Sequence, residues 1–232
     1  MKTLNEIKWR IKVAEYRKNE AAVTSMLPSL GDRATLLDIG CADASGTLSY
    51  AEKAGVPAAN VCGVDIDPDY IEMATTKIKV FAADMEHDPL PFDEGVFDIV
   101  ICNQILEHIK NLRHLLAQVD KVTKPGGFLL ISVPNLAALH NRLGLLFGGQ
   151  PRCAKVLSAH IRGFSPSALK QFLTTNGRFK VVSAGGSGFY PFPAAVSGII
   201  SRLMPTFAVY YMVLLQKTGD GDWDSWNRVP EV

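Results

Sequence analysis

A series of acidic side chains marks where this chain could hold a small ligand. Asp38 closes a short apolar run and is followed by a stretch of mostly small residues, Gly40-Cys41-Ala42-Asp43-Ala44-Ser45-Gly46. Small residues let a ligand lie close to the backbone. This stretch and Asp38 together carry two carboxylates and neither Lys nor Arg. The pattern therefore favours a cationic ligand over a pyrophosphate.

Three more polar side chains follow later apolar runs. Asp65 comes 25 residues after Gly40, where a carboxylate can accept hydrogen bonds from both hydroxyls of a ribose. Asp84 could accept from an adenine amino group, and Asn103 follows the next apolar run. Each residue alone also fits a helix cap. Four such residues at the ends of successive strands predict one nucleoside site.

Alternating elements would bring these residues together. We expect strands over 35–39, 60–65, 78–82, 96–102 and 127–133, and helices over 45–54, 68–76 and 111–122. Such alternation predicts an α/β doubly wound, mostly parallel sheet covered on both faces. Ligands bind at the carboxyl ends of strands in such sheets, which is where the polar residues fall.

The flanking segments complete a single expected domain over residues 1–218. A helix is predicted over 4–27, with 1–34 forming the N-terminal portion. Residues 136–206 would be insertions on the ligand-binding side of the sheet, with helices over 136–147, 166–175 and 194–203 and a lid at 148–165. Strands are predicted over 178–184 and 207–216, and an acidic tail with Trp223 and Trp226 would cover 219–232.

Five pieces of sequence carry a family resemblance: LLDIGCADASG, GVDIDPDYIEMA, FAADMEHDPLPF, FDIVICNQILEHI and KPGGFLLISVPN. With these pieces in order, the chain resembles a class I S-adenosylmethionine-dependent methyltransferase of the type 11 small-molecule kind, near the methionine-biosynthesis-linked family. The resemblance implies a Rossmann-like sheet of seven strands, with the last strand antiparallel and formed by a hairpin of 178–184 and 207–216. It also implies S-adenosylmethionine as cofactor. It places the cofactor against Asp38, Gly40, Cys41, Ala42, Asp65, Ile66, Asp84, Met85 and Asn103.

The first loop departs from the family pattern, which usually has glycines where this chain has Ala42 and Ala44. If either position needs a positive φ, alanine costs about 1 kcal/mol or more. An NAD-dependent oxidoreductase would need G-x-G-x-x-G, and only Gly40 of the three glycines is present. Asp43 adds a charge that repels phosphate. A catalytically silent binding module of the same fold is the other alternative.

Three residues are candidates for work on the acceptor. The sulfonium is already an activated methyl donor, so a general base is needed only if the acceptor must lose a proton. His108 follows the fourth strand, and His160 and Arg162 lie in the connection that would roof the site. Each also has a structural interpretation: His108 could cap the following helix or pack against it, and His160 and Arg162 could be solvated or could hold the loop in place.

The acceptor is expected to be a small molecule, whose methylated atom the sequence leaves open. The net charge of +1 gives no reason to expect nucleic acid. The four cysteines lack CxxC spacing or a nearby histidine pattern, so neither a metal site nor a disulfide is expected. With no signal peptide or transmembrane segment, we expect a cytoplasmic protein. The apolar helix at 136–147, which contains Arg142, could touch a membrane surface.

Overall fold

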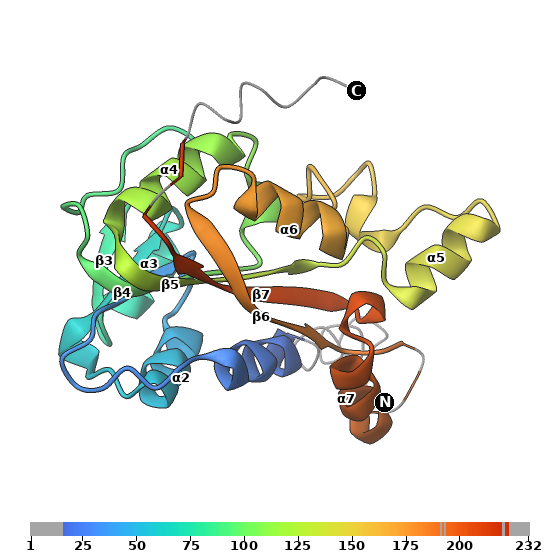
Figure 1. The fold of residues 1–232 in the computed structure, drawn as a ribbon, viewed down its shortest axis with the longest axis horizontal. Coiled ribbons are helices and arrows are strands. Elements are labelled where there is room, and N and C mark those ends of the chain that lie inside the picture. Colours follow the sequence, from blue (N-terminus) through green and yellow to red (C-terminus); the bar gives the residue numbers. More distant parts are fainter. Residues whose placement is uncertain (1–15, 191, 193, 220, 223–232) are drawn as a thin grey trace.

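The computed structural model contains a mixed sheet of seven strands in the order β3-β2-β1-β4-β5-β7-β6 (Figure 1). It describes residues 16–190, 192, 194–219 and 221–222. β7 runs antiparallel to both neighbours, and the other pairs are parallel. The predicted doubly wound fold is therefore confirmed. The strands are β1 (Leu36–Ile39), β2 (Val61–Asp65), β3 (Lys79–Ala82), β4 (Phe97–Asn103), β5 (Thr123–Pro134), β6 (Phe179–Ser187) and β7 (Tyr210–Lys217).

Helices cover both faces of the sheet. On one face lie a helix over residues 16–26, α2 (Ser45–Ala54) and α3 (Pro68–Thr75), and on the other α4 (Leu112–Val122) and α6 (Pro166–Thr174). In Figure 1, α5 (Leu139–Leu146) and α7 (Ala194–Leu203) extend from one end of these layers. Short 3-10 turns are η1 (Ala58–Asn60), η2 (Leu106–His108), η3 (Arg152–Ala154) and η4 (Pro205–Phe207).

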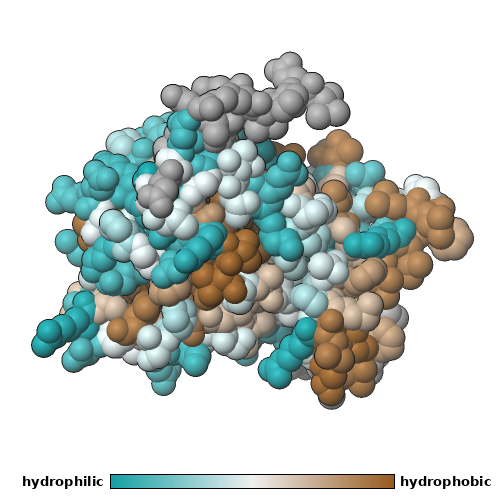
Figure 2. All heavy atoms as spheres, viewed as in Figure 1, coloured by the Kyte–Doolittle hydropathy of each residue, from teal (hydrophilic) through white to brown (hydrophobic). Residues whose placement is uncertain are grey.

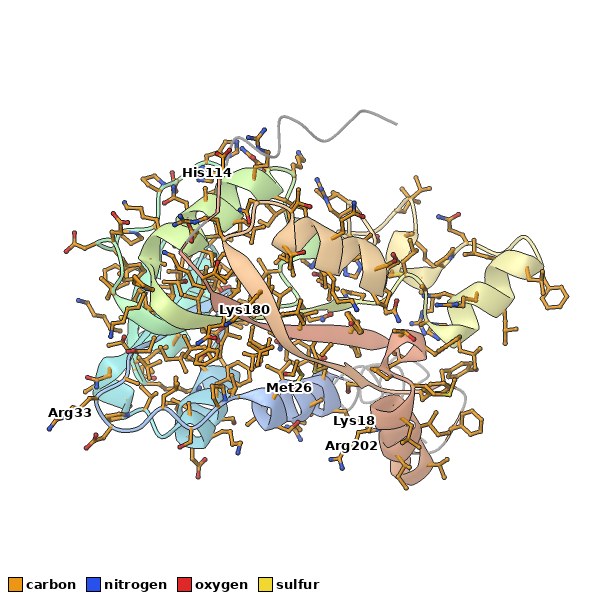
Figure 3. The ribbon with its side chains drawn as sticks, in the orientation of Figure 1. Lys18, Met26, Arg33, His114, Lys180 and Arg202 are labelled. Carbon is orange, nitrogen blue, oxygen red and sulfur yellow. The ribbon has the colours of Figure 1, made fainter. Side chains whose placement is uncertain are left out.

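The strands divide their apolar side chains between two cores. Leu37 and Ile39 of β1 pack with α4 and α6, whereas Leu36 packs with α2 and the 16–26 helix. This follows from the two-residue period of a strand, which sends successive side chains to opposite faces. Met26, labelled in Figure 3, lies near β6, where a Cβ on Gly185 would touch its sulfur. The two cores hold the strand ends of β1, β2 and β4 at one edge.

Several boundaries differ from the sequence expectations. β5 begins at Thr123, and Lys124–Gly127 bulge out because the register jumps from Phe97–Thr123 to Ile99–Phe128. β7 begins at Tyr210, because η4 occupies Pro205–Phe207 and the next two residues lie between this turn and the strand. Of the helix expected over 4–27, the structure describes 16–26. Residues 4–15 and both tail tryptophans lie outside the described residues.

Two properties of the described residues bear on the remaining expectations. All four cysteines are free. No helix in these ranges has the length and apolar character needed to cross a membrane. Apolar side chains do gather on the surface around α5 and α7, where Figure 2 shows the largest brown areas.

Candidate functional site

The loop between β1 and α2 forms the floor of the candidate site. Gly40 has φ +75, and a Cβ there would collide with the side chain of Ile105. Ala42 and Ala44 have φ 46 and 60, in the left-handed region that favours glycine. Both alanines therefore carry the backbone strain that a positive φ imposes on a residue other than glycine. The Ala44 amide closes the turn by donating to the Cys41 carbonyl at 2.8 Å.

Asp65, at the end of β2, is held in place by backbone donors. Its Oδ2 accepts from the amide of Ala42 at 2.8 Å, and its Oδ1 accepts from the amides of Ile66 and Asp67 at 2.8 and 3.0 Å. A carboxylate offers about four acceptor positions, so a further hydrogen bond can still be accepted. The carboxylate is thus fixed against the first loop, as a ribose-binding acid would need.

Asp38 is a buried acid beneath the same loop. It is 4% exposed, and the Thr47 hydroxyl donates to its Oδ2 at 2.6 Å. Burial is the largest cause that raises its pKa to about 7, and the charges of Asp65 and Glu20 raise it further. A cation placed nearby would favour the ionised carboxylate.

One part of the charge pattern inferred from the sequence needs correction. The loop has no basic residue of its own, but Lys77 reaches it from beyond α3. Its ammonium donates to the Asp43 carboxylate at 3.2 Å and to the Asp43 carbonyl at 2.7 Å. Asp43 is therefore paired, and the negative charge available to a ligand comes from Asp38, Asp65 and Glu20.

The helix over 16–26 covers one end of the loop, a contact that the sequence did not indicate. Asn19 donates to Asn103 Oδ1 at 2.8 Å, and Asn103 donates in turn to the Tyr50 hydroxyl at 2.9 Å. Asn103 is 6% exposed, so these bonds hold it inside the protein. Tyr16 and Glu20 join the loop in enclosing a cavity of about 80 Å³.

Of the other expected cofactor residues, Cys41 lines this cavity, whereas Ile66, Asp84 and Met85 lie outside it. Ile66 follows Asp65 and is 65% exposed, whereas Met85 is buried. Asp84 accepts from the Glu86 amide at 2.9 Å and contacts His87 Nδ1 at 3.0 Å. These bonds lower the pKa of Asp84, with the His87 contact as the largest cause. Cys41 is buried beneath the loop, and burial raises the pKa of its thiol to about 12.

The structure brings two of the three acceptor-side candidates together. The rings of His108 and His160 meet edge to face with centroids 4.9 Å apart, although 52 positions separate them in the sequence. His108 Nδ1 lies 3.0 Å from the carbonyl of Ala159, and the amide of Ile161 donates to the carbonyl of Glu107 at 2.9 Å. The end of the 148–165 connection therefore packs against η2.

The third candidate, Arg162, anchors the same connection. Its Nη2 donates to the carbonyl of Lys110 at 2.7 Å, and Asn135 pairs with Phe164 two residues further on. Arg162 also borders an open cavity of about 500 Å³ that Lys110, Phe164 and Phe172 help to line. Its guanidinium is thus committed in part to holding the loop, in line with the structural interpretation.

Glu107 is a candidate that the sequence reasoning missed. It is 2% exposed, and neither carboxylate oxygen has a hydrogen-bond partner among the described residues. Burial raises its pKa to about 8. In the sequence, the signal that could have identified Glu107 is its position next to His108, just after the carboxyl end of β4.

Comparison with known proteins agrees with this arrangement. A family described as "Methyltransferase domain" matches residues 11–184. The human mitochondrial ubiquinone biosynthesis O-methyltransferase is 30% identical over 176 residues, covering 71% of this chain and 46% of that protein. A polyketide synthase-nonribosomal peptide synthetase of Aspergillus clavatus is 26% identical over 148 residues, covering 59% of this chain and 4% of that protein. The S-adenosylmethionine dependent methyltransferase structure from Mesorhizobium loti superimposes with a TM-score of 0.60 at 18% identity, over 85% of this chain and 96% of that one.

The sheet order and the strand-end loop define a Rossmann-like methyltransferase fold of class I. The chain belongs to the methyltransferase domain family, whose match begins at residue 11 and ends within β6. It spans 46% of the human relative and 4% of the fungal synthetase.

Proposed function

We propose that the protein transfers a methyl group from S-adenosylmethionine to a small-molecule acceptor. One observation carries this proposal: the β1–α2 loop lies between two carboxylates, Asp38 and Asp65, at the carboxyl edge of the sheet. Such a setting suits a ligand with cationic sulfonium and ammonium groups and disfavours a pyrophosphate. The family match supports the same class of chemistry.

The residues present fit this donor. When bound, it supplies an activated methyl group. The cavity of about 80 Å³ under the 16–26 helix can enclose one end of such a molecule, close to Asp38. Asp65 is oriented to accept from a ribose, and exposed Ile66 offers an apolar surface for the base. Asp84 would accept from the amino group of the base.

Calorimetry with S-adenosylhomocysteine and with NAD tests the cofactor. We expect binding of the first and none of the second, because NAD carries a pyrophosphate. Asp65→Ala should weaken binding, whereas Asp69→Ala, on the exposed start of α3, should leave it unchanged. Tight binding of NAD in place of S-adenosylhomocysteine would refute the proposal.

Turnover separates an enzyme from a silent binding module of the same fold. Conversion of S-adenosylmethionine to S-adenosylhomocysteine would be followed with a panel of hydroxyl, amine and carbon acceptors. The similarity to an O-methyltransferase supports an oxygen acceptor first. Donor binding without conversion across the panel would favour the silent module.

We propose that the acceptor is apolar and reaches the site from a membrane surface. Exposed apolar side chains support this, including Phe147 at 84% and Leu157 at 98%. Arg152 and Lys155 lie between them in the chain and are exposed, as binding to anionic lipid requires. Flotation with anionic vesicles should recover the protein, and Phe147→Ser with Leu157→Ser should abolish recovery. Equal recovery of both proteins would contradict this route.

A further inference from the structure

Three side chains that could bind a metal meet where the 148–165 connection rests on η2. One ligand atom each from Glu107, His108 and His160 lies within 4.8 Å of the others. Two come from adjacent residues after β4, and the third comes from a segment 52 positions away in the sequence. Only folding brings them together, which is why the spacing of cysteines and histidines in the chain predicted no metal.

The burial of Glu107 is a second, independent observation. Both oxygens of its carboxylate are inaccessible to solvent and have no hydrogen-bond partner within the described part of the chain. An unpaired buried carboxylate is costly, so such groups are normally paired or bound to a metal. Its own backbone carbonyl is satisfied by the amide of Ile161, which fixes the residue in place.

The contact of His108 prepares that imidazole for a ligand. Its Nδ1 lies 3.0 Å from the carbonyl of Ala159. A carbonyl only accepts, so Nδ1 carries a hydrogen, which in the neutral imidazole leaves the Nε2 lone pair for a metal. Metal-binding histidines are commonly oriented by a backbone carbonyl at the other ring nitrogen. Exposed His108 keeps this side of the cluster open to solvent.

We propose that Glu107, His108 and His160 form a binding site for a divalent transition-metal ion. Two imidazoles and one carboxylate suit Zn²⁺ or Mn²⁺ better than Mg²⁺, which prefers oxygen ligands. Bonds of about 2.0–2.1 Å place tetrahedral ligand atoms about 3.3 Å apart. Side-chain rotations that move the ligand atoms by about 1–2 Å would therefore close the site around the ion. With three protein ligands, the ion keeps a position open to an exogenous oxygen.

The open coordination position suggests how the ion would act in methyl transfer, an inference that rests on the proposed function. An acceptor hydroxyl bound to the ion would lose its proton to water more readily, because metal coordination lowers the pKa of a bound oxygen. The ionised oxygen then bonds to the methyl carbon while the carbon–sulfur bond breaks and its electron pair stays on sulfur. The products are the methyl ether and S-adenosylhomocysteine. The site thus points to a hydroxylated acceptor.

Metal binding can be measured without any acceptor. Purified protein would be stripped with EDTA, titrated calorimetrically with Zn²⁺, Mn²⁺ and Mg²⁺, and analysed for bound metal after dialysis. We expect one Zn²⁺ or Mn²⁺ per chain, at least tenfold weaker Mg²⁺ binding, and at least tenfold weaker binding of every ion by Glu107→Gln and His160→Gln. The matched control is His114→Gln on α4, outside the cluster and labelled in Figure 3, which should bind like the wild type.

Binding of S-adenosylhomocysteine provides the check on folding and separates the two proposals. If every variant binds it as the wild type does, the fold is intact and a loss of metal reports on the cluster. Wild-type protein that binds S-adenosylhomocysteine but no Zn²⁺ or Mn²⁺ would overturn the metal site and leave the proposed function standing. Equal metal affinity in Glu107→Gln and wild type would overturn it as well.

Discussion

Replacing Asp38 by Asn should stabilise the protein while weakening its binding of the donor. The carboxylate of Asp38 is 4% exposed and has one partner among its described neighbours, the Thr47 hydroxyl. An Asn oxygen can still accept that hydrogen bond, so the substitution removes the charge and keeps the shape. The buried charge is a cost to folding that only a cationic ligand offsets.

The size of that cost follows from the pKa. Burial raises the pKa of Asp38 from 3.8 to about 7. One pKa unit corresponds to about 1.4 kcal/mol, so ionised Asp38 costs about 4 kcal/mol in the folded state. Leaving the new amide hydrogens of Asn without acceptors costs about 1–3 kcal/mol. The net gain in the free energy of unfolding at neutral and higher pH is therefore about 1–3 kcal/mol.

The sign of the pH dependence is the stricter test. Because the folded pKa lies above the unfolded one, the folded wild type holds a proton that the unfolded chain has lost. Wild-type stability therefore falls as pH rises from about 4 to 7, and the Asn variant lacks this loss. Its advantage should grow by about 2.5 kcal/mol between about pH 5 and about pH 8.

Urea unfolding across this pH range measures the difference directly. Asp43→Asn is the matched control, because Ser45 and Lys77 lower the pKa of Asp43 and the expected change is opposite in sign. Calorimetry with S-adenosylhomocysteine at about pH 8 should show affinity falling roughly tenfold or more in Asp38→Asn, as expected for losing a charged acceptor. A difference in stability that stays constant with pH would refute the reasoning.

Three further substitutions test the site and its frame. Asp65→Ala should lower affinity for S-adenosylhomocysteine by roughly 10–100-fold in calorimetry, because a charged acceptor worth about 1.5–3 kcal/mol is lost. Ala44→Gly should raise the free energy of unfolding by about 1 kcal/mol in urea titrations, since φ 60 favours glycine. The variant should keep its affinity for S-adenosylhomocysteine, and a loss of that affinity would show that the loop needs alanine. Asp120→Ala should lower the free energy of unfolding by about 3–5 kcal/mol, because Lys217 and Arg178 lose the buried carboxylate that they contact at 3.2 and 2.9 Å. A smaller loss would mean that both basic side chains rearrange to solvent.

The sheet and the strand-end residues were predictable because each depends on local sequence. Apolar runs that end in an acid predicted β1 and β2, and the two-residue period decided which side chains enter each core. The strand expected over 127–133 starts too late, because Pro125 and the two following glycines break the apolar pattern where β5 begins with a bulge. A sequence pattern does not reveal that pairing resumes on both sides of a bulge.

The contacts that the sequence did not reveal all join distant segments. The hydrogen bond from Asn19 to Asn103 spans 84 positions, and Lys77 reaches Asp43 over 34. In the sequence, Asn19 belongs to a charged helix and Lys77 to a loop, and neither has a spacing relation to the residue that it contacts. Glu107 was overlooked for a related reason: its interest lies in its burial, which depends on how the later connection folds over it.

The site combines several features that oppose stability with a frame that holds them. Ala42 and Ala44 keep positive φ because each amide has a fixed partner, Asp65 Oδ2 for the first and the Cys41 carbonyl for the second. Asp38 stays buried beneath them although its charge is unpaired by any cation in the described structure. Strain and buried charge in one loop persist only where the surroundings hold them, and they gather where a ligand is to be bound. The same reasoning applies to the buried carboxylate of Glu107. A bound cation would therefore offset a free-energy cost of folding at two places, Asp38 and Glu107.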